Sequence, residues 1–197
     1  MRVWILLCAA VVFGLWQYVS NREIPHAPGV LAAAEPLQGD ISGPPPVFDK
    51  AGYKITALAS FDITARVISS EHYHFDRESD LAPVDLAVGW GPMSDTAVLK
   101  QLSFSQDHRF YFYHWSSTPP IPAGDIVTHS ANMHLIPATT GVAKRLSRVR
   151  AGNLVHFKGY LVKVEAPDGW RWVSSLTRSD TGAGACELVW VEDLDAS

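Results

Sequence analysis

An alternation of apolar and polar residues between positions 53 and 67 constrains the fold of this chain more than any other feature. Every odd position from Tyr53 to Val67 is apolar, and the even positions are polar except for Leu58. A period of two places one set of side chains on one face of a strand, whereas a helix would scatter them around its circumference. We therefore predict a strand here with one buried face and a bend midway.

Weaker patterns predict the other elements. We expect strands over residues 109–115, 154–164, 170–178 and 186–191, with a bulge at Gly159 in the second of them. Ser94 and Thr140 are residue types that cap helices, and each precedes a short helical pattern, over 94–102 and 140–149. The predicted class is mainly β (α+β), with one antiparallel β domain and two short helices.

The N-terminus carries an uncharged apolar run from Val3 to Val19. Seventeen residues of helix span about 25 Å, near the lower limit for crossing a bilayer. We predict a transmembrane signal anchor over residues 1–20, membrane contact through residues 3–19, and a single-pass protein of the bacterial inner membrane with its domain on the periplasmic side. A cleaved signal peptide, with Ala32–Ala34 as the cleavage site, is the alternative.

Six prolines lie within residues 21–46, which include Pro44-Pro45-Pro46. Proline fixes φ and favours extended chain, so we predict a semi-rigid linker over 21–46. The mainly β extracytoplasmic domain is then expected over residues 47–197.

Part of this domain resembles the OB-like small β-barrels. The resemblance is carried by the spacing of Val149, Gly152, Val155 and Gly159, followed by the turn Pro167-Asp168-Gly169. SH3-like barrels share the pattern, so the resemblance implies an OB-like or SH3-like portion over about a quarter of the chain.

Several stretches look like those of uncharacterised bacterial envelope proteins that have one N-terminal membrane anchor. They lie around His26–Leu31, Pro83–Gly91 and Asn132–Pro137, and at Asp180-Thr181-Gly182 with Cys186-Glu187. This resemblance implies a compartment and no activity.

His72, His74 and Asp76 form a His-x-His-x-Asp run. On a strand all three side chains would point to one face, and imidazole and carboxylate are suitable ligands for zinc or another divalent metal. A divalent metal is therefore the cofactor hypothesis. A polar surface loop is the alternative, because Glu71, Arg77, Glu78 and Asp80 surround the run.

Two further histidines, His129 and His134, flank a polar turn that leads into an apolar stretch. Either imidazole has the chemistry of a general base near neutral pH. These residues define the hydrolase hypothesis, while hydrogen bonding to the backbone is the structural alternative.

A basic region spans residues 139–178, which contain eight Lys and Arg residues and two acidic residues. Trp170, Arg171 and Trp172, together with Lys158 and Arg178, are predicted to form a stacking and cationic binding surface. An anionic envelope ligand or a protein partner fits this surface, and nucleic acid does not fit the predicted compartment. The alternative is that the tryptophans fill the core and that the basic residues form a solvated face.

Cys186 is the only cysteine outside the apolar run, and it alternates with Leu188 and Trp190. We expect a buried thiol that is inert rather than a nucleophile. Asp180-Thr181-Gly182 matches the aspartic-protease triplet, but no second triplet exists, so a glycine-rich loop is expected there.

The leading functional hypothesis is a membrane-tethered extracytoplasmic binding or assembly module, and the alternative is a His-centred envelope hydrolase.

Overall fold

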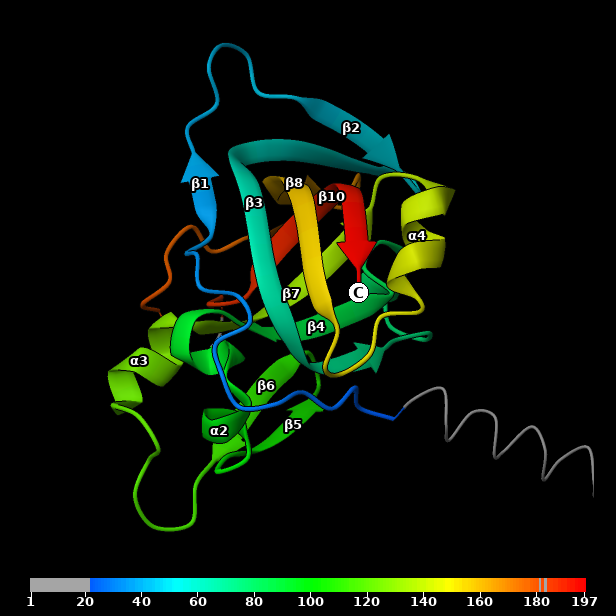
Figure 1. The fold of residues 1–197 in the computed structure, drawn as a ribbon. Helices are drawn as coiled ribbons and strands as arrows, with labels where there is room; N and C mark the ends of the chain where they lie inside the picture. Colours follow the sequence, from blue (N-terminus) through cyan, green and yellow to red (C-terminus); the bar gives the residue numbers. More distant parts are fainter. Residues whose placement is uncertain (1–21, 181, 183) are drawn as a thin grey trace, which may run out of the picture.

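The computed structural model describes residues 22–180, 182 and 184–197, and it is mainly β as the sequence predicts (Figure 1). The predicted anchor over residues 1–20 lies outside this range, and no helix within the range is long and apolar enough to cross a membrane. The strands are β1 (Leu37–Gly39), β2 (Val47–Lys50), β3 (Tyr53–His72), β4 (Val84–Gly89), β5 (Ser103–Asp107), β6 (Phe110–His114), β7 (Ser130–Pro137), β8 (Leu154–Glu165), β9 (Arg171–Val173) and β10 (Glu187–Ala196). The helices are η1 (Glu78–Asp80), η2 (Gly91–Ser94), α2 (Thr96–Leu99), α3 (Ala123–Thr128) and α4 (Thr140–Leu146).

Strand β3 is the longest element, and it confirms the predicted alternation. All eight odd-numbered residues from Tyr53 to Val67 are buried. The register against β8 shifts between Ala57 and Ala59, so Leu58, the one residue that breaks the pattern, is an extra residue in the strand. Figure 1 shows β3 curving strongly along its length, as a bulge favours.

The strand pairings follow a path that returns to its start. Strand β3 pairs with β4, β4 with β7, β7 with β10, β10 with β8, and β8 with β3. The prediction that the sheet is antiparallel needs one correction, because β7 and β10 are parallel. Their parallel pairing is allowed because α4, β8 and β9 intervene in the chain between them.

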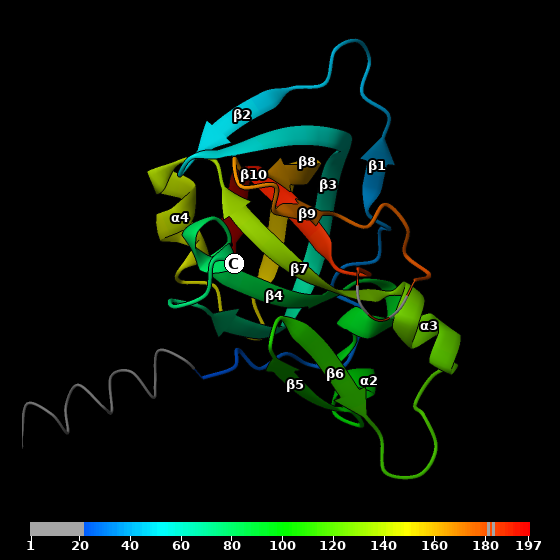
Figure 2. The same ribbon diagram turned by 180° about the vertical axis from the view of Figure 1, so that it is seen from behind.

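The apolar side chains divide into three buried clusters. The largest lies under β3, β4, β7, β8 and β10 and is closed on one side by Val142 and Leu146 of α4. A second cluster includes Trp190 and packs against Trp170 and Trp172. The third, around Met93 and Ile126, packs against Phe104 and Tyr113 of the separate hairpin of β5 and β6. This hairpin lies at the end of the molecule opposite β2 (Figures 1 and 2).

The predicted helices form, with shorter spans and different caps. Helix α2 is capped by the side chain of Asp95 rather than Ser94, and α4 by Thr139 rather than Thr140. Each carboxylate or hydroxyl accepts a hydrogen bond from an amide of the first turn. The predicted bulge at Gly159 lies in the partner strand instead, since the β8–β10 register shifts between Val191 and Asp193.

Residues 22–35, here called the N-terminal strap, lie against the domain instead of forming a free spacer. Glu23 contacts the buried Arg66 at 3.2 Å, and the amide of Ile24 donates to the carbonyl of Ala151 at 2.9 Å. Further along, β1 and β2 both pair with β3. Backbone amides within the predicted linker therefore donate to the domain, among them those of Ile24, Gly29, Leu31 and Ala32.

Candidate ligand-binding site

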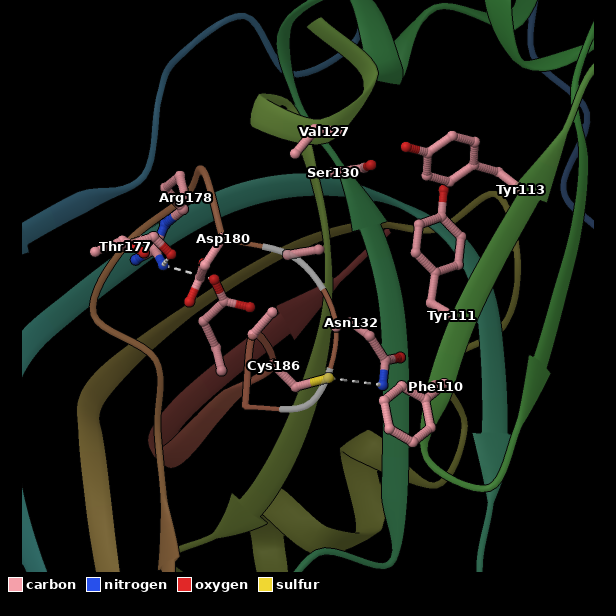
Figure 3. A pocket seen from close by; sticks show the side chains of 14 residues that line it. Phe110, Tyr111, Tyr113, Val127, Ser130, Asn132, Thr177, Arg178, Asp180 and Cys186 are labelled. Carbon is pink, nitrogen blue, oxygen red and sulfur yellow. Dashed lines mark hydrogen bonds and ion pairs between the residues drawn. The ribbon is translucent and has the colours of Figure 1, made fainter. Parts of the chain in front are cut away.

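A cavity of about 210 Å³ lies between β6, β7 and the segment that precedes β10 (Figure 3). We call it the Glu187 cavity, after its most deeply buried charged residue. Its lining consists of Phe110, Tyr111, Tyr113, Val127, Ser130, Ala131, Asn132, Thr177, Arg178, Asp180, Gly182, Ala185, Cys186 and Glu187. Aromatic side chains of β6 form one wall, and the charged residues lie on the opposite one (Figure 3).

Strand pairing explains why these residues meet. Glu187 is the first residue of β10 and pairs with Met133 of β7, so Cys186 lies beside Asn132. Along β6 the side chains alternate, and Tyr111 and Tyr113 point inward while Phe110, Phe112 and His114 are exposed. The parallel pair β7–β10 and the hairpin therefore build the two long walls of the cavity.

Glu187 has an environment unusual for a carboxylate. Its side chain is 2% exposed, and burial raises its pKa to about 7 although the charge of Arg178 opposes this rise. Oε1 accepts from Nη1 of Arg178 at 2.6 Å, whereas Oε2 has no partner among the described protein atoms. A buried carboxylate normally has both oxygens satisfied. Oε2 of Glu187 therefore lacks the hydrogen bond that a buried carboxylate oxygen normally accepts.

A second buried polar atom of a lining residue is the hydroxyl of Tyr111, which lies beside the hydroxyl of Ser130 but makes no hydrogen bond of good geometry in the described protein. Burial raises the pKa of this phenol, so it stays protonated at neutral pH. The neighbouring hydroxyl of Ser130 donates to the carbonyl of Ile126. Tyr111 therefore offers both a donor and an acceptor at the aromatic wall.

A second cavity, of about 420 Å³, lies on the other side of Cys186, which lines both. We call it the His134 cavity. It is lined by Asp76, Glu78, His108, Arg109, Phe110, His134, Trp172, Val173, Gly184 and Cys186.

His134 and Arg109 in this second cavity both contact a fully buried carboxylate, that of Asp85. Nδ1 of His134 lies 2.9 Å from one carboxylate oxygen, without the alignment of a good hydrogen bond, and Nη1 of Arg109 lies 2.9 Å from the other. Arg109 also makes two bonds to Asp76 and one to the carbonyl of Ala82. Its guanidinium is therefore largely committed to holding these segments together.

The structure brings together only some of the residues that the sequence singled out. His134 contacts Trp172, with ring centroids 4.9 Å apart, and Asp76 lines the same cavity. His129 lies elsewhere, with Nε2 3.2 Å from Glu35, so the two histidines do not form one site.

The predicted metal run also takes a different arrangement. Asp76 binds Arg109 and caps the amide of Ser79, while His74 packs edge-on against Phe75. Within residues 22–180, 182 and 184–197, no three His, Cys, Asp or Glu side chains gather as metal ligands would. The metal site at His72, His74 and Asp76 stays a prediction.

The predicted cationic surface is dispersed over several faces. Trp172 lines the His134 cavity and Arg178 the Glu187 cavity, whereas Lys158 lies in a shallow groove beside β1. Trp170 packs against the second apolar cluster and stacks under Arg77 at 4.7 Å, and Arg171 contacts Glu165. Both tryptophans are partly buried and pack against the second apolar cluster, which agrees with their alternative assignment to the core.

Sequence reasoning missed Glu187, Tyr111, Asp85 and Arg109. A signal existed for two of them, because Asp85 and Glu187 each stand within an otherwise apolar strand. A charge in such a strand is buried, and a buried charge needs a partner or a function. Nothing in the sequence indicated which residues would face them.

Comparison of the chain with protein-family models, with curated proteins and with solved structures finds no match to any of them. The function is therefore argued from the site.

Proposed function

We propose that this chain is a membrane-tethered extracytoplasmic binding module whose ligand site is the Glu187 cavity. One observation carries the proposal: two residues that line one cavity, Glu187 and Tyr111, each hold a buried polar atom, Oε2 and the phenol hydroxyl, without a hydrogen-bond partner in the described protein. Each such atom costs about 1–3 kcal/mol when it stays unsatisfied. A bound ligand would offset that cost, and the aromatic wall supplies apolar contact beside it.

The strand order supports an OB-like domain. In that fold, a long curved first strand pairs with both the second and fourth strands, and a helix lies between the third and fourth. Here β3 pairs with β4 and β8, and α4 lies between β7 and β8. The parallel β7–β10 pair corresponds to the third and fifth strands. OB-like domains use such a scaffold for binding, often through loops at one end.

The tether rests on the apolar run over residues 3–19. The strap begins at residue 22, and Glu23 and Ile24 are both held by the domain. Three residues of extended chain span at most about 11 Å. If the run crosses the inner membrane as proposed, the domain lies directly on the periplasmic surface. Alkaline extraction of membranes and protease accessibility in spheroplasts test this, and release of the full chain into the soluble fraction contradicts it.

The binding role can be tested directly by a substitution that fills the cavity with a larger side chain. We expect the full chain to bind members of a small polar-compound library, measured by ligand-observed NMR. Val127→Trp should abolish these signals, because the larger side chain would occupy the cavity from α3. The matched control is Val47→Trp, which changes an exposed residue of β2 that lines neither this cavity nor the His134 cavity. A library that gives no signal, or signals that survive in Val127→Trp, would falsify the assignment.

The alternative function, an envelope hydrolase, is favoured by one contact. Oδ2 of Asp85 lies 2.9 Å from Nδ1 of His134, which is the spacing of a carboxylate–imidazole pair in a general-base site, and a small rotation of the ring would align the hydrogen bond. Any turnover of ester, amide or phosphodiester probes that His134→Gln abolishes and His129→Gln does not would favour this function over the binding module.

A further inference from the structure

We infer that the ligand of the Glu187 cavity is a small organic cation, with an ammonium or guanidinium head at Glu187 and an apolar body against the aromatic wall of β6. This inference rests on the proposed binding function and names the ligand class that this site selects.

The head-group end of the cavity has more negative than positive charge. Glu187 and Asp180 are acidic, and Arg178 is the one cation among the residues that line the cavity in the described chain. The hydroxyl of Ser175 donates to Oδ2 of Asp180 at 2.6 Å. The guanidinium of Arg178 donates to the carboxylate of Glu187. A cationic ligand would therefore balance the charge of this end, with its head group beside the carboxylate of Glu187.

Arg178 is poorly placed to attract an anion. Its Nη1 donates to Glu187 and to the carbonyl of Thr177, and its Nη2 donates to Gln38. The guanidinium also lies over the ring of Phe61, 5.1 Å from its centroid. With three of its five donors and one face of the guanidinium occupied, Arg178 positions Glu187 and has few donors left for a carboxylate or phosphate.

The opposite wall suits the body of an organic cation. Phe110, Tyr111 and Tyr113 all come from β6, and their rings line the cavity (Figure 3). Aromatic faces attract cations and pack against apolar groups. The volume of about 210 Å³ limits the ligand to one small molecule or one amino-acid side chain.

The test uses three probes of one shape that differ in their head group: 2-phenylethylamine, 2-phenylethanol and 3-phenylpropionate. Isothermal titration of the full chain in non-ionic detergent at pH 8 measures each affinity. We expect the amine to bind at least about tenfold more tightly than the alcohol, and the acid to bind most weakly. Glu187→Gln should weaken the amine about tenfold or more and leave the alcohol nearly unchanged.

Two further variants distinguish a specific effect of Glu187→Gln on affinity from misfolding of the domain. Glu192→Gln makes the same change at an exposed position of the same strand and should leave all three affinities unchanged. Tyr111→Phe retains the ring and the charge of Glu187, and should weaken the amine three- to tenfold by removing one hydroxyl. Thermal unfolding of each variant reports whether the domain is intact.

The pH dependence gives a readout that a merely structural Glu187 would not change. Amine affinity should rise between pH 6 and 8 as Glu187 ionises, and this rise should vanish in Glu187→Gln. The other ionisable groups that face the cavity are Arg178, Asp180, Cys186, Tyr111 and Tyr113. Burial raises the pKa of the thiol and of both phenols, so they do not ionise in this range.

The outcomes separate the ligand class from the binding function. Equal affinity for all three probes, or tighter binding of the acid, overturns the cation and leaves the binding module standing. Absence of binding by every probe also overturns the cation, and the library experiment with Val127→Trp then decides the binding function independently.

Discussion

At the scale of single residues, Glu187 makes the domain sensitive to pH. Burial raises its pKa in the folded chain to about 7, above the ordinary value of about 4.3 in an unfolded chain. Between these values the folded state binds more protons, so its contribution to stability is fully present below about pH 4 and falls as pH rises toward 7. The full effect is at most roughly 4 kcal/mol.

We therefore expect the difference in stability between wild type and Glu187→Gln to change sign or shrink as pH rises from 5 to 8, with the wild type losing stability relative to the variant. Urea unfolding at each pH measures this difference. Glu192→Gln, which alters an exposed carboxylate, should show a constant difference over the same range. A constant difference for Glu187→Gln as well would show that Glu187 ionises normally.

Cys186 provides a second prediction at this scale. Its Sγ lies 3.8 Å from the carbonyl of Arg109 and 4.0 Å from Asn132, and burial raises its pKa to about 11. Because the thiolate is the reactive form, the native thiol should react with an aromatic disulfide reagent at least roughly a hundredfold more slowly than in the unfolded chain. Absorbance at pH 8 measures this in a Cys8→Ser background. Rapid native reaction would instead indicate an activated thiolate.

At the scale of elements, the sequence predicted what depends on local periodicity. The alternation over 53–67 defined β3 because its buried face is continuous. The return strand predicted over 170–178 ends at Val173, since the backbone there leaves β8, and the amide of Ser175 bonds to the carbonyl of Cys186 instead. That switch depends on which strands are neighbours, and no local pattern encodes it. The two cavities escaped prediction for the same reason.

Gly159 shows how one element determines the approach of another. A Cβ at this position of β8 would lie 1.9 Å from the carbonyl oxygen of Trp190 in β10. Gly159→Ala should force these strands apart and cost roughly 3–5 kcal/mol of unfolding free energy, measured by urea denaturation. Gly124→Ala is the matched control, because nothing lies within 4 Å of its Cβ, and it should change stability by less than about 1 kcal/mol. Comparable losses in both variants would contradict the close approach.

At the scale of the whole molecule, the strap joins the N-terminal end of the described chain to the β domain through a few defined contacts. The hydroxyl of Ser94 accepts from the amides of Leu31 and Ala32, both at 3.1 Å, and it donates to the carbonyl of Gly91 at 2.8 Å. Ser94 is fully buried, so these bonds are not exchanged easily for bonds to water. The strap is therefore part of the folded unit, even though its proline content is that of a linker.

Ser94→Ala removes the shared acceptor and leaves two amides of the strap without a partner. We expect a loss of about 1–3 kcal/mol of stability, and faster hydrogen exchange at Leu31 and Ala32 than at the β3 core. Ser105→Ala, on the exposed face of β5, should change neither by a measurable amount. If exchange instead accelerates equally in the strap and in β3, the strap opens only with the whole domain, and strap and domain form a single cooperative unit. Unchanged exchange at both amides would mean that Ser94 does not secure the strap.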